Sequence, residues 1–445
     1  MTGRPEPGSA GSASRERGLG ALELVAIGVG GMIGGGIFSV LGLAVQISGH
    51  GAWIAFLLGG LVALGAGYSY CRLALAFPVD GASFTYLERA FPRRRGIAVV
   101  TGWTVIVGYV GTLALYAFTF GAYGAALLAG PTSPLLLRHL LSAGVLVFFV
   151  IVNLRGVRAS GVSEDLIVYA KVVILAIFAI AGFANFDGAR ILPVFDHGLA
   201  SVFVAAATVF VAYEGFQLIN SAVEETRRPQ RDVPIGIYGA IAIVTTIYVL
   251  LALTSLGTLG ADGLIAAREY ALAEAARPVL GRAGEVLVAL AALLATSSAI
   301  NATIFGAARL MAQMAEEGMM PTALRHRSHR GVPDRAVVLL AVAGGVLAIT
   351  GGLDLITSFS SLTFLLVSAA VAVANGRLKA KTGARIGIVA ASLLLMATTI
   401  TLVIIHMLRN EPAALAAILA LYGVTAAAAL GYFRDGRKAG KETEP

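Results

Sequence analysis

Two ionisable side chains, Lys171 and Glu214, lie inside long apolar segments of the chain. A charged residue at the centre of a membrane helix costs at least about 2.5–3.5 kcal/mol, so such residues are candidates for function. Because desolvation favours the neutral amine, alternating hydration would load and release a proton on Lys171. We therefore predict a proton-coupling role for Lys171. The alternative is that this lysine, near the start of its segment, extends to the headgroups at the membrane surface.

Glu214 lies at a polar interruption of a second apolar segment, Tyr213-Glu214-Gly215. Three roles fit its carboxylate. It could bind a cationic substrate, join the proton path, or accept hydrogen bonds from the amides of its own helix break.

A glycine run interrupts the first apolar segment, with five glycines in the seven residues from Gly30 to Gly36. Each glycine costs a helix roughly 1 kcal/mol relative to alanine. The run therefore predicts a break between two good helical flanks. Lipid cannot satisfy the backbone groups that such a break frees, so the segment is a candidate ligand site. The competing interpretation is a close helix-packing surface.

The chemistry of two such breaks matches one class of ligand. Amides around Gly35 and Gly36, at the positive end of a half-helix, suit a carboxylate. Carbonyls before each break, near Gly31 and Ala212, suit an ammonium group or a small cation. One ligand that carries both groups is an α-amino acid. The predicted substrate site comprises Ile33, Gly34, Gly35, Gly36, Ala212, Tyr213, Glu214 and Gly215.

Other residues at membrane depth are weaker candidates for the substrate pocket. Tyr213 and Phe216 could form a wall for the substrate side chain, although aromatic residues in helices commonly only pack. Ser297, Ser298 and Asn301 could lie opposite the first break, although serine often bonds back to its own helix.

Composition indicates a polytopic helical membrane protein. The chain has 445 residues, of which 58% are hydrophobic and 13% charged, whereas soluble domains carry about 25% charged residues. The apolar runs are long and are separated by short basic loops. We predict twelve spans, near residues 20–47, 52–77, 98–128, 135–153, 163–184, 199–223, 234–258, 284–314, 335–352, 355–375, 385–407 and 412–432.

The net charge of +8 reflects topology rather than a nucleic-acid partner. Of the 33 Lys and Arg residues, 24 fall in the two termini and the even-numbered loops, and only 6 fall in the other loops. The remaining 3 lie in or at the ends of spans. We predict a multi-pass protein of the cell membrane. By the positive-inside rule, both of its termini are predicted to face the cytoplasm.

The two interrupted spans occupy positions 1 and 6, five spans apart, so they cross the membrane in opposite directions. Interrupted helices at corresponding positions of inverted halves are typical of a transporter binding site. We expect a disordered cytoplasmic tail over residues 1–18, a single transmembrane domain over 19–433 and a second cytoplasmic tail over 434–445. The domain divides into a first repeat at about 20–184, a second at about 199–375 and additional helices at about 385–432.

Other function classes fit the sequence less well. Cys71 is the single cysteine, so neither an intrachain disulfide nor a thiolate metal cluster is expected, and no cofactor or catalytic residue is predicted. A channel would need a continuous polar stripe or an acidic ring, whereas charges inside these spans are few and isolated. An integral membrane enzyme would need convergent His, Cys or carboxylate groups.

Four segments resemble signatures of amino acid–polyamine–organocation permeases. Residues 31–38 are similar to the helix-1 signature of that family, and 203–234 to its helix-6 signature, which includes Ala212-Tyr213-Glu214-Gly215-Phe216. Residues 77–87 resemble the loop after helix 2, and 309–321 the end of helix 8. The resemblance implies a leucine-transporter-like fold, with discontinuous helices 1 and 6 in a 5+5 inverted repeat plus two additional helices.

The resemblance also bears on function. Proton-coupled members of the family place a lysine at the position of Lys171, where sodium-coupled relatives bind sodium. The family usually has Ser or Thr where this chain has Gly35, so a carboxylate here relies on backbone amides. The expected function is proton-coupled amino acid transport by alternating access. Transport of polyamines or other amines and amino acid exchange remain alternatives, and the sequence does not indicate an oligomeric state.

Overall fold

The computed structural model describes residues 18–78, 83–130, 132–156 and 161–442, without the side chains of 161–165 and 434–442. The N-terminal tail predicted over 1–18 therefore lies outside the described residues except for Gly18. The regular elements of the described residues are helices, and one isolated β-bridge joins Leu19 to Thr226. The prediction of an all-α protein is confirmed.

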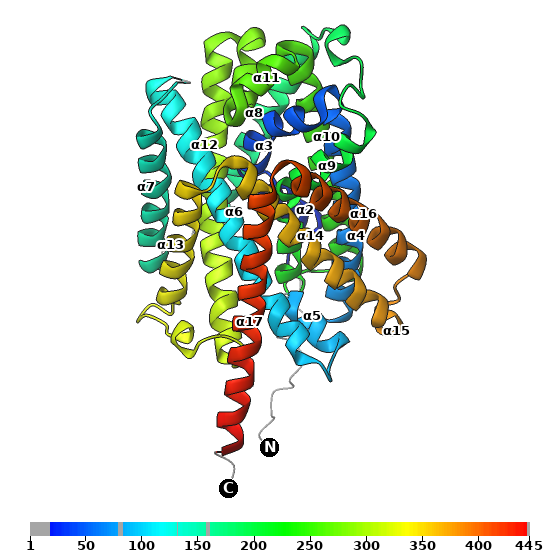
Figure 1. Ribbon diagram of the computed structural model, residues 1–445, viewed down its shortest axis with the longest axis vertical. Helices are drawn as coiled ribbons and strands as arrows, with labels where there is room; N and C mark the ends of the chain where they lie inside the picture. Colours follow the sequence, from blue (N-terminus) through cyan, green and yellow to red (C-terminus); the bar gives the residue numbers. More distant parts are fainter. Residues whose placement is uncertain (1–17, 79–82, 131, 157–160, 443–445) are drawn as a thin grey trace, which may run out of the picture.

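Helices follow the predicted spans closely (Figure 1). The first half of the chain forms α2 (Ala21–Met32), α3 (Gly36–Ser48), α4 (Ala52–Ala76), α5 (Ser83–Ala90), α6 (Arg95–Ala129), α7 (Leu135–Leu154) and α8 (Gly161–Phe183). The second half forms α9 (Leu199–Val209), the 3₁₀ turns η3 (Phe210–Tyr213) and η4 (Phe216–Ala222), α10 (Pro229–Leu259), α11 (Ala261–Ala267), α12 (Ala271–Glu316), α13 (Asp334–Thr350), α14 (Leu353–Arg377), α15 (Lys379–Thr382), α16 (Ile386–Asn410) and α17 (Pro412–Glu442). Within α12, the backbone kinks at Gly281.

Ten helical segments in the described residues are long and apolar enough to cross a membrane. The difference from the twelve predicted spans has two causes. Helices α3 and α4 run on through a 3₁₀ turn and form one segment, Gly36–Ala76. Helix α13 has 17 residues, at the lower limit for a spanning helix, and is not among the ten.

Spans 1 and 6 are both broken, as predicted. The helix of span 1 stops at Met32 and restarts at Gly36, and span 6 changes from α9 through η3 to η4. Helix α3 packs against α9, and α2 packs against η4. Because α2 precedes α3 while η4 follows α9, the two broken spans run in opposite directions. The boundaries of the two repeats remain predictions.

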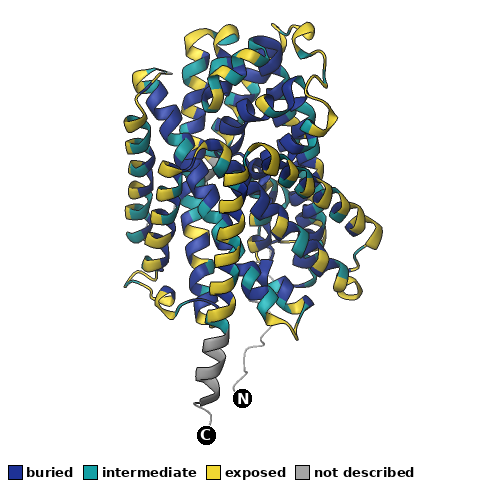
Figure 2. Cartoon of the chain, viewed as in Figure 1, coloured by how far each residue is buried: buried dark blue, intermediate teal, exposed yellow. Residues whose placement is uncertain are grey.

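Helices α6 and α10 flank the two breaks. Helix α10 packs against α2, α4 and η4, and α6 packs against α12 and α14. Both helices have extensive buried faces, whereas large apolar side chains of the outer helices α7, α13 and α16 are exposed (Figure 2). An exposed apolar belt is what a lipid environment requires of the outer helices.

At its C-terminal end the chain remains helical further than expected. Helix α17 continues to Glu442, so the backbone of most of the predicted tail 434–445 is helical.

Candidate functional site

Lys171 occupies the break of span 1. Its side chain is fully buried, and its Nζ donates hydrogen bonds to the carbonyl oxygens of Gly30, at 2.8 Å, and Ile33. These carbonyls belong to the last turn before the break and to the break itself. The Lys171 amino group therefore satisfies backbone carbonyls that lipid would leave without a partner. The alternative in which Lys171 extends to the headgroups does not fit this geometry.

Tyr248 of α10 joins the two breaks. Its hydroxyl lies 2.9 Å from the carbonyl oxygen of Met32 in span 1 and 2.9 Å from that of Ala212 in span 6. A hydroxyl has a single hydrogen to donate, so the two carbonyls share it. The tyrosine is fully buried, and it fixes the two broken spans relative to each other.

Two further side chains make hydrogen bonds to backbone groups at the break of span 6. Ser361 of α14 donates to the carbonyl of Thr208 at 2.6 Å and accepts from the amide of Val211 at 2.9 Å. Gln217 accepts from the amide of Gly215 at 3.1 Å and donates to the carboxylate of Glu214. These side chains therefore hold the break in place.

The backbones of the two breaks touch. Gly215 has a φ of 133°, and a Cβ there would lie 2.3 Å from the carbonyl carbon of Gly31. A Cβ on Gly36 would lie 2.6 Å from the Cα of Ala212. Only glycine permits this approach, because any side chain would have to occupy the space of the facing backbone.

A cavity of about 180 Å³ lies beside these breaks, on the side of α2 and η4. It contains Glu214 and Gly215 from the predicted substrate site and Ser298 from the weaker candidates. Its wall is formed by residues of six spans: Ala26, Ile27, Gly30, Gly31, Tyr109, Thr112, Tyr116, Val168, Glu214, Gly215, Gln217, Leu218, Ser298, Ala299, Ala302, Thr303, Gly306, Ala307 and Phe364. The cavity is mostly apolar, with a carboxylate and several hydroxyl groups at its edge, as small-ligand sites commonly are.

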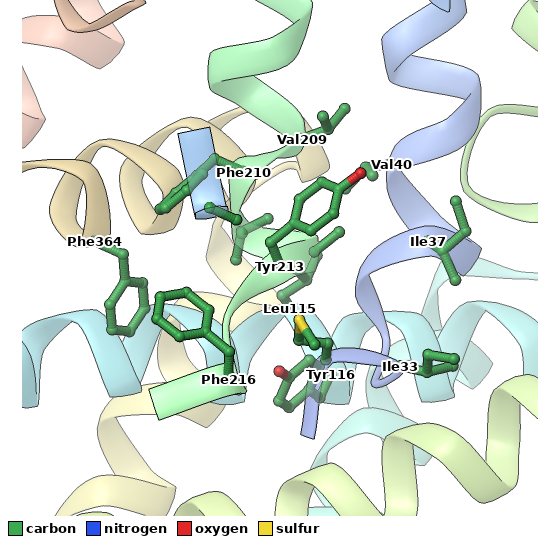
Figure 3. Packing of buried hydrophobic residues seen from close by; sticks show 14 of the residues in the cluster. Ile33, Ile37, Val40, Leu115, Tyr116, Val209, Phe210, Tyr213, Phe216 and Phe364 are labelled. Carbon is green, nitrogen blue, oxygen red and sulfur yellow. The ribbon is translucent and has the colours of Figure 1, made fainter. Parts of the chain in front are cut away.

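The glycines predicted to bind a carboxylate do not line this cavity. A Cβ on Gly34 or Gly35 would lie 3.0 Å or 2.8 Å from the ring of Tyr116. Figure 3 shows this ring beside the unwound stretch at Ile33. Gly34 to Gly36 therefore serve close packing in this conformation, which is the alternative interpretation of the run. Among the described residues, no side chain caps the first amides of α3.

Tyr213 and Phe216 are not among the residues that line the cavity. Tyr213 is fully buried and donates to the carbonyl of Phe56 at 2.6 Å. Phe216 packs edge-on against Tyr70, with ring centroids 5.7 Å apart. The structure places both in the core between helices and not on a substrate wall.

The polar residues of span 8 separate into two groups. Ser298 reaches the cavity, whereas Ser297, although close in sequence, does not. The Asn301 side chain accepts a hydrogen bond from the side-chain amide of Asn153 at 2.9 Å, which ties α12 to α7. Ser298 therefore lines the same cavity as Gly30 and Gly31 of span 1, and its role in substrate binding stays a prediction.

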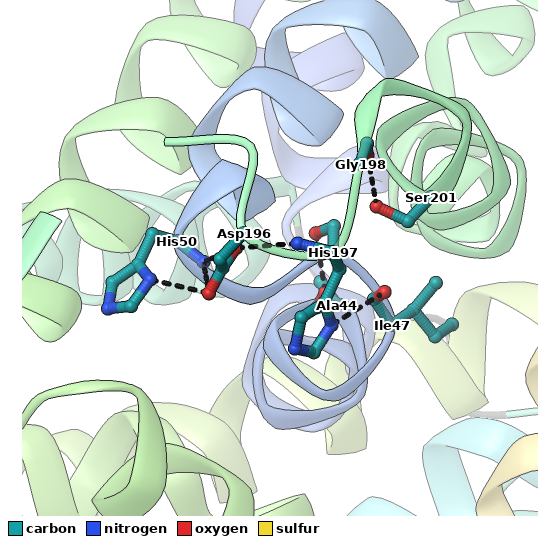
Figure 4. Close-up of polar contacts among 8 residues, drawn as sticks. Ala44, Ile47, His50, Asp196, His197, Gly198 and Ser201 are labelled. Atoms are coloured by element: carbon teal, nitrogen blue, oxygen red, sulfur yellow. Dashed lines mark hydrogen bonds and ion pairs between the residues drawn. The ribbon is translucent and has the colours of Figure 1, made fainter. Parts of the chain in front are cut away.

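A second polar cluster holds the far ends of the broken spans together (Figure 4). Asp196, just before α9, lies 2.6 Å from Nδ1 of His50 and accepts from the backbone amide of His50 at 3.2 Å. The neighbouring His197 contacts the carbonyl of Ile47, near the end of α3, at 3.2 Å. The pairing of α3 with α9 is thus fixed at the end away from the cavity.

Several functional contacts were missed by the sequence analysis. Tyr248, Ser361 and Gln217 hold the breaks, and Tyr109, Thr112 and Tyr116 of α6 line the cavity. Their common signal is a polar atom in an apolar segment, since a buried tyrosine hydroxyl needs a partner. Sequence does not show which helix that partner lies on.

Comparison with known proteins relates this chain to membrane transport proteins. A family model described as "Amino acid permease" matches residues 19–407. The chain is 31% identical over 364 residues to the inner membrane transport protein YbaT of Escherichia coli (strain K12), covering 81% of this chain and 84% of that one. It is 27% identical to the branched-chain amino acid permease BcaP of Bacillus subtilis (strain 168), covering 82% of each. It is 31% identical to cationic amino acid transporter 5 of Arabidopsis thaliana, covering 78% of this chain and 62% of that one.

Proposed function

Since this chain belongs to the amino acid permease family, we propose that it is a secondary transporter that carries an amino acid across the cell membrane by alternating access, coupled to protons. Membership makes it a membrane permease and not an enzyme. The coupling ion, the direction of transport and the identity of the substrate belong to the proposal.

The position of Lys171 carries the proton-coupling part of this proposal. Its Nζ contacts Gly30 and Ile33, and Gly30 also lines the cavity. Hydrogen bonds from a charged donor are roughly twice as strong as neutral ones. Loss of the proton therefore weakens the hold on the break of span 1 next to the substrate cavity. The Gly30 carbonyl therefore links the protonation of Lys171 to the shape of the cavity.

The cavity supports a substrate that carries an amine. The Glu214 carboxylate and the backbone of Gly31 lie on its wall, while Phe364 and Ala302 offer an apolar surface. A substrate carboxylate would approach the first amides of α3 once the ring of Tyr116 moves aside. Amino acids with both groups fit this arrangement best, and polyamines or other amines and an exchange mode remain the alternatives.

The test is uptake by purified protein in liposomes. A thermal-shift screen of amino acids and polyamines first selects the substrate, because a ligand of the folded state raises apparent stability. We expect the unmodified protein to accumulate that substrate when the exterior is acidic. Lys171→Gln should abolish this accumulation, because glutamine cannot bind and release the coupling proton, while substrate exchange without a gradient continues.

Two matched variants sharpen the test. Lys171→Arg keeps a donor at Gly30 and Ile33 but does not deprotonate, so it should also lose accumulation. Lys379→Gln changes a lysine of α15 outside the predicted spans and should behave like the unmodified protein. Normal gradient-driven accumulation by Lys171→Gln would refute proton coupling through this residue. Absence of uptake and exchange for every amino acid and amine would refute the transport function itself.

A further inference from the structure

Gln217 of η4 makes two hydrogen bonds with one side-chain amide at the wall of the substrate cavity. Its carbonyl oxygen accepts from the backbone amide of Gly215 at 3.1 Å, and its NH₂ group donates to the carboxylate of Glu214. A backbone amide can only donate and an ionised carboxylate can only accept, so these partners fix which end of the glutamine amide faces which group. All three residues line the cavity.

The two side chains of this contact differ in burial and in charge. Glu214 is 4% exposed, whereas Gln217 is only partly buried. Among the described residues, the hydrogen bond to the Glu214 carboxylate comes from Gln217, whose side chain is neutral. An ammonium group would add the attraction between opposite charges, which is strong away from bulk water. An ammonium group that enters the cavity would therefore displace the glutamine NH₂ group from this carboxylate.

The amide of Gln217 has the same two polar functions as a free α-amino acid. Its NH₂ group is a donor, as a substrate ammonium is, and its carbonyl oxygen is an acceptor, as a substrate carboxylate is. Glu214 and the Gly215 amide therefore suit a ligand that carries a donor and an acceptor close together. A protonated polyamine has donors only, so it would replace the contact to Glu214 and leave the Gly215 amide without an acceptor.

The other predicted site for a carboxylate is covered in the described conformation. The ring of Tyr116 occupies the space beside Gly34 and Gly35, before the first amides of α3. The Gly215 amide is instead covered by the Gln217 side chain, which can turn toward the cavity by rotation about its own side-chain bonds. Movement of one side chain therefore makes both the Gly215 amide and the Glu214 carboxylate accessible.

We propose that Gln217 is an internal stand-in for the substrate. In the empty protein, its amide occupies the places of the ammonium and carboxylate groups of an α-amino acid, and the amino acid binds by displacing it. This inference rests on the proposed function and narrows it to a substrate that carries both groups. Gln217 lowers the affinity of the site, because each substrate molecule replaces two existing hydrogen bonds.

The experiment is isothermal titration calorimetry of the purified full-length protein. The probe is the standard L-amino acid that most raises its thermal stability. Gln217→Met keeps the length of the side chain but removes its donor and acceptor, so it should bind this amino acid about tenfold more tightly, the ratio that corresponds to one hydrogen bond with a charged group. The matched control is Gln313→Met, because Gln313 donates to Glu317 at 3.0 Å and neither residue lines the cavity. The control should leave the dissociation constant unchanged.

A second variant tests the two ends of the amide separately and decides the question if Gln217→Met does not fold. Gln217→Glu keeps an acceptor for the Gly215 amide and adds a negative charge beside Glu214. The new carboxylate competes with a substrate carboxylate but not with an ammonium group. Gln217→Glu should therefore shift the preference from the amino acid toward the amine that lacks its carboxylate.

The outcomes separate this inference from the proposed function. Unchanged or weaker amino acid binding by folded Gln217→Met, or an unaltered preference in Gln217→Glu, would overturn the stand-in role and leave amino acid transport in place. If no standard amino acid binds the unmodified protein, the proposed function itself fails.

Discussion

At the scale of single residues, the two helix breaks are stable because other side chains take up the backbone groups that they expose. Lys171 takes two carbonyls of span 1, Tyr248 is shared between both spans, and Ser361 serves span 6. An unsatisfied buried polar group costs about 1–3 kcal/mol. These contacts are therefore necessary for a broken helix at membrane depth, before any substrate is considered.

The backbone geometry at Gly215 favours glycine over every other residue. Its φ of 133° is unfavourable for other residues, and a Cβ would meet the carbonyl carbon of Gly31 at 2.3 Å. We expect Gly215→Ala to lower the stability of the purified protein by about 2 kcal/mol or more, since strained backbone alone costs of order 1–3 kcal/mol. The measurement is the midpoint of thermal unfolding in detergent.

Gly423→Ala provides the control for this prediction. Gly423 lies within α17, and nothing is within 4 Å of a Cβ placed there. Alanine should raise stability slightly there, by up to about 1 kcal/mol, because it favours a helix over glycine. If both variants shifted the midpoint equally, the close contact between the two breaks would not be the cause.

At the scale of elements, α10 acts as the brace between the broken spans. It packs against α2 and η4, and its Tyr248 reaches the carbonyls of Met32 and Ala212. At the opposite end, Asp196 connects the start of α9 to the end of α3 through His50. The cavity therefore lies next to the end of the broken pair that the His50–Asp196 contact does not hold. That end is held separately, by the bridge between Leu19, just before α2, and Thr226, after η4.

Tyr248→Phe tests the brace. Removal of the hydroxyl leaves two buried carbonyls with one donor fewer, so we expect a loss of about 1–3 kcal/mol in stability. Transport should fall as well, because the two breaks lose their shared contact. The measurements are thermal unfolding and substrate exchange in liposomes.

Tyr213→Phe is the comparison for this variant. The Tyr213 hydroxyl bonds to Phe56, outside the breaks, so its loss should reduce stability with a smaller effect on exchange. Should the Tyr213 variant impair exchange as strongly as the Tyr248 variant, the special role of α10 would be refuted.

At the scale of the whole molecule, the distribution of charge predicts orientation in the membrane. Lys and Arg residues number 24 on the side of the termini and 6 on the other side. The predicted orientation places the termini and the side of the substrate cavity next to α2 toward the cytoplasm.

Reporter fusions test this orientation. Alkaline phosphatase fused after Pro445 should be inactive in a bacterial host, because the enzyme needs the oxidising periplasm for its disulfides. A green fluorescent protein fused at the same place should fluoresce. The same phosphatase fused after Arg190, in a loop predicted to be outside, should be active. Activity of the C-terminal phosphatase fusion would reverse the predicted topology.

The sequence by itself determined the class of protein, the approximate spans, the two breaks and their opposite directions. These follow from apolar segment length and from the cost of glycine in a helix, which are local properties of the chain. It also singled out Lys171 and Glu214, because an ionisable group in an apolar span is rare enough to stand out.

Only the tertiary structure decided which groups meet at the breaks. Lys171 lies 141 residues from the carbonyl of Gly30 in the chain, and Tyr248 lies 216 residues from that of Met32. Whether the glycine run binds a ligand or packs against Tyr116 depends on how α6 is placed beside it. These contacts depend on helix packing and rotation, and a sequence in which nearly every face is apolar carries little information about either.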